Sequence, residues 1–349
     1  MSLDNFIKKH ASNWMKEGKG EYSDIVISSR IRLARNIDNI PFPQLADQNQ
    51  QKQVEKMVSE TIDNKDHYRF LLMSSLSYED RLTLVEKHLI SPTLINESKY
   101  SGVWLNNEET VSIMINEEDH IRIQVVLPSL NLEEGLQVAD EIDNLIESKL
   151  EYGFDEQKGY LTACPTNLGT GLRASVMVHL PALVLTKQIN RVLTAVSQLG
   201  LAVRGIYGEG SESLGNILQI SNQVTLGQSE TEIIDNLRRV SKQIIDHELN
   251  SRKYLMEENK VALLDKVYRA YGILSNAYTI TSKEALELLS YVKLGVDLEL
   301  LDGINPHFFK ELIVITRPGF LQKLYGQQLS SEVRDIKRAE VIREVLQKK

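Results

Sequence analysis

The stretch with the densest potential for chemistry is an acidic run between two apolar segments. Residues 116–122 read NEEDHIR, in which Glu117, Glu118 and Asp119 are consecutive and Arg122 follows closely. Apolar and polar residues then alternate as they do in a half-buried strand. The pattern predicts two strands that meet at an acidic turn, with carboxylates for a cation and Arg122 for an anion. A solvated hairpin tip is the alternative, because acidic residues and asparagine are common in turns.

A second candidate group consists of arginines on or beside strand-like segments. In the segment SSRIR, residues 28–32, Arg30 and Arg32 share one face if the extended conformation of the preceding residues continues. Three further arginines occupy similar positions: Arg122, Arg173 and Arg204. Arginine makes forked contacts with phosphate oxygens, so their convergence predicts a site for a polyphosphate nucleotide. A solvated strand edge is the alternative.

A glycine-rich loop carries the single cysteine of the chain. Residues 159–173 place small and hydroxyl side chains around Cys164, and we expect Gly169 and Gly171 to let the backbone approach a ligand closely. The loop is not a Walker loop, because no Gly-Lys-Ser/Thr follows and the next segment is strand-like. A buried structural thiol is the alternative for Cys164, although its polar surroundings favour an accessible one.

The loop carboxylates Glu118 and Glu209 complete the set. Glu209 lies in residues 207–215, which form either a mobile connection or a lid that carries a carboxylate. Carboxylates that face a thiol suit a planar cation as acceptor, because two acids can hold a guanidinium and one can take its proton. Together with the arginines, this combination predicts phosphoryl transfer to a guanidinium nitrogen.

The composition limits the classes of partner. The chain has 349 residues, of which 42% are hydrophobic and 25% charged, and its formal net charge is −8. This balance argues against a general affinity for nucleic acid or anionic membranes, so an anion site must be a local cluster of arginines. One cysteine excludes an intrachain disulfide, and we find neither a signal peptide nor an apolar run of transmembrane length. We therefore expect a cytoplasmic protein.

The hydrophobic patterning predicts an α+β protein with two domains. Strands are predicted at the acidic hairpin and near residues 25–27, 201–206 and 217–220, and helices over residues 47–66, 78–89, 132–152 and 181–199. Ser229 and Glu232 form a capping box, after which helical periodicity continues with few breaks. We place the domain boundary near residue 255, which gives a catalytic domain of residues 1–254 and a helical domain of residues 255–349.

The last predicted helix contains a basic motif, RDIKRA, at residues 334–339. Arg334 and Arg338 are four residues apart and share a face, where their guanidinium groups repel each other unless an anion lies between them. A solvated basic face, relieved by neighbouring acids such as Asp335, is the alternative.

Four of these motifs resemble, in order, the motifs of phosphagen (guanidino) kinases. They are SSRIR at 28–32, NEEDHIR at 116–122, CPTNLGTG at 164–171 and RGIYGE at 204–209. The resemblance implies an antiparallel sheet flanked by helices, followed here by a smaller all-helical domain. Small-molecule members of the family carry a long helical domain before the first arginine motif, whereas here that motif begins by residue 28. This difference and the C-terminal helices resemble bacterial protein arginine kinases, whose donor is MgATP and whose acceptor is an arginine side chain in a protein.

The resemblance implies a role for each candidate residue. Glu118 would hold the acceptor guanidinium and take its proton, Glu209 would assist from its loop, and Cys164 would contact the guanidinium. ATP binding is implied for Ser28, Ser29, Arg30, Ile31, Arg32, His88, Arg122, Arg173, Ala174, Ser175, Val176, Met177, Arg204, Gly205, Ile206, Tyr207 and Gly208. An allosteric phosphoarginine site is implied at Arg334, Asp335, Arg338 and Ala339. The ATP phosphates would carry Mg²⁺, so no dedicated metal ligands are expected.

The resemblance also implies partners. They are protein substrates with arginine residues, an activator protein, the Clp unfoldase and protease machinery, and a stress-gene repressor as a substrate. A homodimer without direct membrane or nucleic-acid contacts is implied as well. Without a long N-terminal cover, we expect an open acceptor site that admits a protein. The alternatives are a kinase for free arginine and an idle phosphoarginine-binding adaptor, although intact Glu118, Cys164 and Glu209 argue against an idle site.

Overall fold

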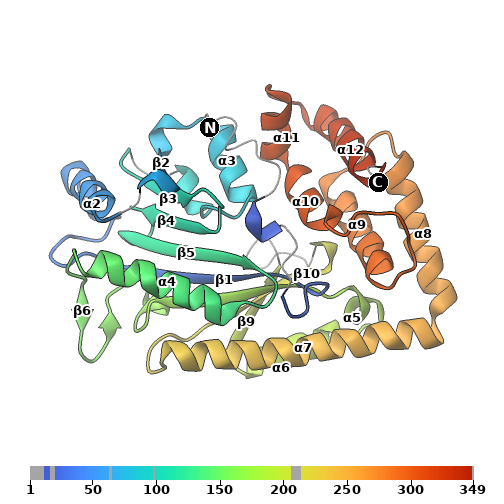
Figure 1. Ribbon diagram of the computed structural model, residues 1–349, viewed down its shortest axis with the longest axis horizontal. Coiled ribbons are helices and arrows are strands. Elements are labelled where there is room, and N and C mark those ends of the chain that lie inside the picture. The colour runs from blue at the N-terminus through green and yellow to red at the C-terminus, as the bar shows by residue number, and fades with distance from the viewer. Residues whose placement is uncertain (1–11, 16–19, 63–64, 97–98, 206–213, 348–349) are drawn as a thin grey trace.

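Most of the strands belong to one antiparallel sheet. The computed structural model describes residues 12–15, 20–62, 65–96, 99–205 and 214–347. Within these residues, eight strands pair in the order β2-β3-β4-β5-β1-β8-β10-β9, and β6 pairs with β7 separately (Figure 1). The strands are β1 (Val26–Arg35), β2 (Tyr68–Leu72), β3 (Gly102–Asn106), β4 (Val111–Ile115), β5 (Ile121–Pro128), β6 (Phe154–Asp155), β7 (Gly159–Tyr160), β8 (Leu172–His179), β9 (Leu201–Gly205) and β10 (Ile217–Asn222).

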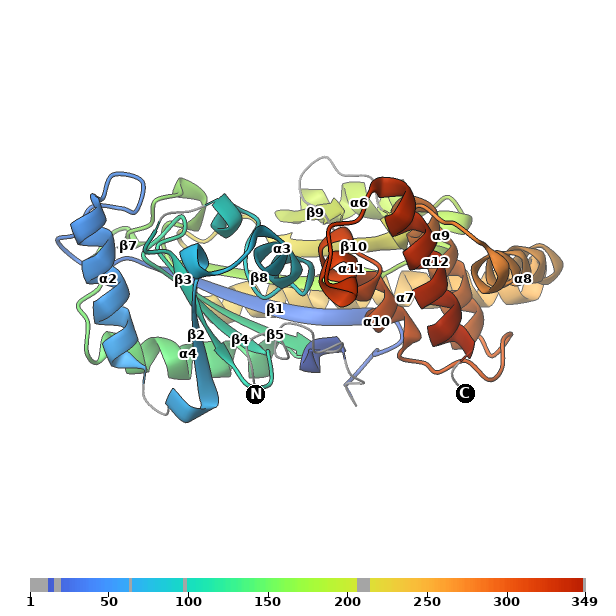
Figure 2. The same ribbon diagram turned by 90° about the horizontal axis from the view of Figure 1, so that it is seen from above.

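The helices divide into those that cover the sheet and those that follow it. The first group comprises α2 (Gln48–Thr61), α3 (Tyr78–Glu86), α4 (Leu132–Glu147), α5 (Pro181–Leu185), α6 (Ile189–Gln198) and α7 (Glu230–Glu258). The second comprises α8 (Lys260–Asn276), α9 (Ser282–Asp297), α10 (Phe308–Ile315), α11 (Pro318–Tyr325) and α12 (Ser331–Gln347). Figure 2 shows α8, α9 and α12 beyond one end of the strands, and α10 and α11 beside that end. This arrangement confirms the predicted fold class.

The two faces of the sheet have different partners. On one face, α4 and α7 pack on the central strands, and side chains such as Ile31, Ile123 and Val176 form the main hydrophobic core with them. On the other face, Val126, Met177 and other side chains join a second core that includes the C-terminal helices. Arg30 and Arg32 of β1, Arg122 and Gln124 of β5, and Arg173 of β8 face this second side, where they line cavities.

The boundary predicted near residue 255 falls within a continuous helix. The capping box of Ser229 and Glu232 starts α7 as predicted, and the helix then runs without interruption to Glu258. Because the second core contains side chains from both the sheet and the C-terminal helices, the two regions are packed together. The division into residues 1–254 and 255–349 stays a prediction.

Some predicted elements differ from those observed. β1 continues to Arg35, well beyond the predicted apolar residues, because its pairing with β5 and β8 on both sides satisfies its backbone. The helix predicted over residues 132–152 ends at Glu147. The helix predicted over residues 181–199 is broken into α5 and α6, and Lys187 between them has a positive φ of 58°.

Candidate active site

The register of the sheet aligns the predicted arginines on one face. Arg32 of β1 lies opposite Arg173 of β8 on one side and opposite Gln124 of β5 on the other. Arg122 precedes Gln124 by two residues, and Arg204 belongs to the edge strand β9. Because side chains alternate across a strand, these residues project from the face opposite α4 and α7.

Two adjoining cavities share these arginines. The first, the thiol cavity, has a volume of about 560 Å³, and its lining includes Glu118, Cys164, Thr166, Asn167 and Gln223. The second, the histidine cavity, has a volume of about 510 Å³, and its lining includes Arg30, Leu82, Val85, His88, Gln124, Gln219 and Ser221. Both are lined by Arg32, Arg122, Arg173 and Arg204, which we call the arginine row. The row thus lies between the cavity that contains Glu118 and Cys164 and a cavity whose wall is partly apolar, with side chains such as Leu82 and Val85.

Arg30 and Arg32 are partly buried cations, and each has one buried donor without a partner. Their Nε atoms are buried and have no hydrogen-bond partner among the described residues. Burial, together with Arg30, Arg122 and Arg173 nearby, lowers the pKa of Arg32 well below its usual value. Burial also lowers the pKa of Arg30 to about 10. Because a buried charge is costly without a partner, these side chains fit a polyanion such as a nucleoside triphosphate.

The acids of the β4–β5 hairpin differ in what they face. Glu117 and Glu118 both bind Arg122, with Oε2 atoms 2.6 Å and 2.8 Å from its Nη1 and Nη2 atoms, respectively. The side chain of Glu117 is 1% exposed, whereas that of Glu118 is 37% exposed and lines the thiol cavity. Of these two acids, Glu118 is therefore the one accessible to an acceptor. Their two ion pairs with Arg122 illustrate how paired carboxylates bind a guanidinium.

Asp119, the third acid, connects the hairpin to the cysteine loop. It is fully buried, and its Oδ1 atom accepts hydrogen bonds of 2.7 Å from Asn36 Nδ2 and from the backbone amide of Ala163. Cys164 directly follows Ala163 in the chain. It is partly exposed, and its Sγ atom lies 3.0 Å from Thr166 Oγ1. Asp119 thus serves to hold Cys164 beside Glu118 rather than to face a ligand.

The glycines of the cysteine loop approach the chain itself. Gly169 has a φ of 111°, and a Cβ atom there would lie 2.5 Å from the carbonyl oxygen of Thr225. Gly171 has a φ of 67°, and its Cβ atom would lie 2.6 Å from the carbonyl oxygen of Ala34. Both glycines therefore pack the loop against neighbouring backbone. Gly171 also lines the thiol cavity, and the close approach of this loop to a ligand stays a prediction.

We expect Gly171→Ala to destabilise the fold more than a glycine change at a similar φ in open space. Gly200 has a φ of 74°, and no atom lies within 4 Å of the place that a Cβ atom would take, so Gly200→Ala serves as the control. The backbone conformation should cost both variants about 1–2 kcal/mol, and only Gly171→Ala adds a clash with backbone. Urea unfolding measures both values, and equal losses would contradict this explanation.

His88 lies at the inner wall of the histidine cavity. Its Nδ1 atom is 3.2 Å from Arg30 Nη2, and its carbonyl oxygen accepts a 2.9 Å hydrogen bond from Gln124. Burial, with Arg30 and Arg317 nearby, lowers the pKa of His88 to about 3. The neutral imidazole can therefore accept a hydrogen bond from Arg30 through Nδ1 and help to orient this guanidinium.

Several residues predicted to bind ATP do not line either cavity. Ile31, Ala174 and Val176 are buried in the main core on the opposite face of the sheet, because they alternate with the arginines along their strands. On that face too, Ser29 donates to the carbonyl of Ser129. Others not found in the lining are Ser28, Ser175, Met177 and Gly205. Ile206, Tyr207, Gly208 and Glu209 lie outside the described residues.

Some residues that line the histidine cavity were not predicted from the sequence. Gln124 shares the polar face of β5 with Arg122, so the alternation already seen in the sequence could have identified it. Ile313, Arg317 and Pro318 come from the C-terminal helices. No local pattern marks these three residues, because only tertiary packing brings them to the sheet.

The C-terminal basic motif combines a buried arginine with a more accessible one. Arg338 is 2% exposed, and it donates to the carbonyl oxygens of Thr316 and Ile280 and binds Asp335. Arg334 is partly exposed and donates to the carbonyl of Leu329 at 2.8 Å. The two arginines therefore differ in role, and Arg338 anchors α12 to the ends of neighbouring segments.

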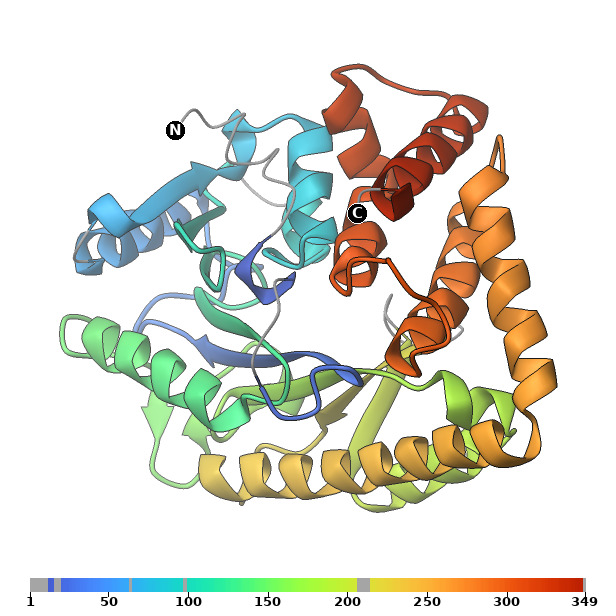
Figure 3. The same cartoon turned by 45° about the vertical axis from the view of Figure 1, so that its right-hand side comes forward.

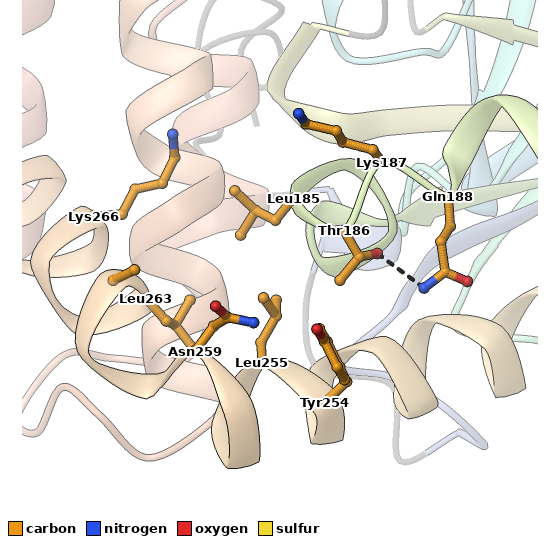
Figure 4. Close-up of a pocket in the computed structure, with 10 residues that line it drawn as sticks. Leu185, Thr186, Lys187, Gln188, Tyr254, Leu255, Asn259, Leu263 and Lys266 are labelled. Carbon is orange, nitrogen blue, oxygen red and sulfur yellow. Dashed lines mark hydrogen bonds between the residues drawn. The ribbon is translucent and has the colours of Figure 1, made fainter.

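Another cavity lies away from the arginine row. It has a volume of about 500 Å³ and lies between the end of α5 and the junction of α7 and α8 (Figure 4). Leu185, Tyr254 and Leu263 contribute to its lining, which includes none of the predicted site residues. In the described part of the chain, no helix is long and apolar enough to cross a membrane. The same residues contain no group of three or more His, Cys, Asp or Glu that could hold a metal ion.

Comparison with known families agrees with this geometry. The family model described as "ATP:guanido phosphotransferase, C-terminal catalytic domain" matches residues 49–251, more than half of the chain. The chain therefore belongs to the ATP:guanido phosphotransferase family, as its motifs predicted. A second model, "Protein-arginine kinase McsB C-terminal domain", matches residues 260–349.

Relatives that match along nearly the whole chain are described as protein-arginine kinases. A protein-arginine kinase from Brevibacillus brevis is 52% identical over 351 residues, with 99% of this chain and 98% of the relative covered. One from Bacillus subtilis is 49% identical, with 99% and 96% covered.

Solved structures support the fold. Lombricine kinase has a TM-score of 0.59 at 28% identity, with 67% of this chain and 68% of that chain covered. A duplicated taurocyamine kinase from Schistosoma mansoni, with bound transition-state analogue components, has a TM-score of 0.61 at 23% identity. This second likeness covers 76% of the present chain and 41% of the other, and at that identity it supports the fold alone.

Proposed function

We propose that the protein transfers the γ-phosphoryl group of ATP to arginine side chains in other proteins. The observation that carries this proposal is the arginine row, which lies where the thiol cavity and the histidine cavity meet. ATP in the histidine cavity would place its phosphates on the row, with its base among apolar side chains. An acceptor guanidinium in the thiol cavity would then approach the terminal phosphate from the opposite side.

The residues supply charge and orientation rather than a covalent intermediate. Glu118 would hold the acceptor guanidinium and take one of its N–H protons as the nitrogen attacks phosphorus. The new N–P bond forms as the bond between phosphorus and the oxygen of ADP breaks, and the arginine row stabilises the charge on the transferring group. Cys164, which lines the same cavity as Glu118, would contact the guanidinium, and Glu209 is proposed to assist on the basis of its motif alone.

Mg²⁺ is proposed to arrive on the ATP phosphates, where it would neutralise part of their charge. Among the described residues, the acids that line the two cavities are Glu118 and Glu86. Glu117 and Glu118 are both bound to Arg122, so their charge is already partly balanced.

The experiment that tests this proposal offers two acceptors in parallel with labelled ATP and magnesium. One is free arginine, and the other is an unfolded arginine-rich protein, with a lysine-substituted version as the matched control. We expect acid-labile, base-stable label on the arginine-rich protein alone. Label on free arginine alone would instead support a small-molecule kinase. ATP binding without label on either acceptor would favour the idle adaptor.

We also propose that Arg334 and Asp335, with Arg338 and Ala339, bind phosphoarginine on α12. Arg334→Ala or Asp335→Asn should weaken binding of a phosphoarginine peptide by about tenfold or more, because each removes a charged partner. The affinity for MgATP should not change. Lys337→Ala is the control on the same helix. Arg338 is unsuitable for this test because its side chain also holds two backbone carbonyls. Peptide titrations with unchanged affinity would remove the site from this helix.

The remaining partners are proposed from the resemblance. They are an activator protein, the Clp unfoldase and protease machinery, a stress-gene repressor as substrate, and a second copy of the chain. A cytoplasmic location is proposed with them. Arginine phosphorylation changes a cation into a group that carries negative charge, which a degradation or regulatory partner can distinguish from unmodified arginine.

A further inference from the structure

The helix α3 of the sheet region packs against α11 of the C-terminal region. In Figure 1 the two helices face each other across the boundary, and Figure 3 shows the same neighbours as a cyan helix beside a red one. We call the contact between α3 and α11 the seam. An ion pair lies at one end of this seam, and a capping contact lies at the other. At one end Lys323 binds Asp80 at 2.6 Å. At the other end Glu86 contacts the start of α11.

Glu86 acts as a cap for α11 that is supplied from a distant part of the chain. Its Oε1 and Oε2 atoms accept hydrogen bonds of 2.8 Å and 2.7 Å from the amides of Gly319 and Phe320. These amides are among the donors that a helix start leaves unsatisfied. A Cβ atom at Gly319 would lie 2.7 Å from Leu82 Cγ and 2.8 Å from Glu86 Oε2, so the two helices pack closely at this point.

The residues just before this cap line the histidine cavity. Arg317 and Pro318 directly precede Gly319, and Ile313 lies one turn earlier, on α10. Glu86 itself lines the same cavity. Arg317 adds a cation beside Ile313 and Pro318 on the part of the wall that the C-terminal region supplies. Its Nε atom donates to the carbonyl of Ile313 at 3.2 Å.

We propose that Glu86 is a positioning residue for nucleotide binding. By fixing the start of α11 against α3, it holds Arg317 and Pro318 as the wall that the nucleotide contacts. The inference rests on the proposed function, in which the histidine cavity binds ATP. It adds that the C-terminal helices contribute part of the donor site.

The charge state of Glu86 provides a distinctive readout. Burial raises its pKa to about 7, although the two amides and Arg317 oppose this shift. The charged groups that face it are Arg317 and Arg338, and His88 is neutral across this range. The carboxylate that caps α11 therefore predominates above pH 7 and is lost as the pH falls below it. The difference in ATP affinity between the wild type and Glu86→Gln should therefore be larger at pH 8 than at pH 6.

The test measures MgATP affinity and steady-state kinetics for the full chain and for Glu86→Gln, with Lys323→Met as the matched control. We expect Glu86→Gln to raise the KM for ATP roughly tenfold at pH 8, a size typical of coupling between sites, with kcat changed by less than about twofold. The difference should shrink at pH 6. Lys323→Met, which breaks the contact at the far end of the seam, should behave as the wild type.

A second variant covers the case in which Glu86→Gln loosens the fold. Arg317→Met removes the cation but leaves the cap in place, and it should also raise the KM for ATP. Unchanged ATP affinity in both variants would overturn the inference, as would an equal loss in Lys323→Met. A wild-type chain that does not bind MgATP, or that binds it equally well after Arg32→Met, would overturn the proposed function itself.

Discussion

Glu118→Gln is expected to lower phosphoryl transfer by about 10²- to 10⁴-fold, the range associated with loss of a general base. Glutamine has nearly the same shape and can still accept the hydrogen bond from Arg122 Nη2, which lies 2.8 Å from Glu118 Oε2. It cannot take a proton from the acceptor guanidinium. The fold and the affinity for MgATP should therefore be retained, and the loss should fall on kcat.

The control for this variant is Glu134→Gln, an exposed carboxylate on α4 away from both cavities. Label transfer from ATP is measured for both variants, with circular dichroism to confirm the fold. Transfer by Glu118→Gln within tenfold of the wild-type rate would remove Glu118 from the role of base.

Arg32→Met is expected to abolish nucleotide binding and to raise the stability of the ligand-free protein. Arg32 is partly buried near Arg30, Arg122 and Arg173, and its buried Nε atom has no partner within the described residues. Replacing such a charge with an apolar side chain of similar length removes repulsion and desolvation cost. We expect a gain of roughly 1 kcal/mol or more in the free energy of unfolding, within the range known for buried charges.

The two effects of Arg32→Met are measured separately. Urea unfolding without nucleotide gives the stability, and thermal unfolding with added MgATP gives the stabilisation by ligand. Arg239→Met, at an exposed position on α7, is the matched control and should change neither. A less stable Arg32→Met protein that still gains stability from MgATP would show that Arg32 is structural and not part of the phosphate site.

Much of the site was predictable because it depends on short-range patterns. The alternation on β5 and the pair Arg30 and Arg32 on β1 define which side chains share a face. Glycine, cysteine and acid motifs then identified the loops that border this face. Residues within the same motifs, such as Ile31, were included because a motif does not indicate which face each side chain occupies. Strand alternation directs the side chain of Ile31 into the main core, and its part in nucleotide binding stays a prediction.

The rest depends on contacts between distant segments. Glu117 and Asp119 flank Glu118 in sequence, and only their burial in the fold distinguishes these two acids from the accessible Glu118. The partner of Glu86 is 233 residues away along the chain. Neither helical periodicity nor local motifs carry information about such a pairing. The contribution of Arg317 to the histidine cavity could therefore be identified only from the three-dimensional structure.

The most direct test of the central claim uses a mimic of the transferring group. Nitrate is planar and anionic, as a metaphosphate-like transition state is, and should bind on the arginine row between MgADP and an arginine peptide. Calorimetry would measure the affinity for MgADP alone, with each addition, and with both. We predict at least tenfold tighter MgADP binding only when nitrate and the arginine peptide are both present, and loss of this effect in Arg32→Met. The same MgADP affinity under all conditions would contradict transfer across the arginine row.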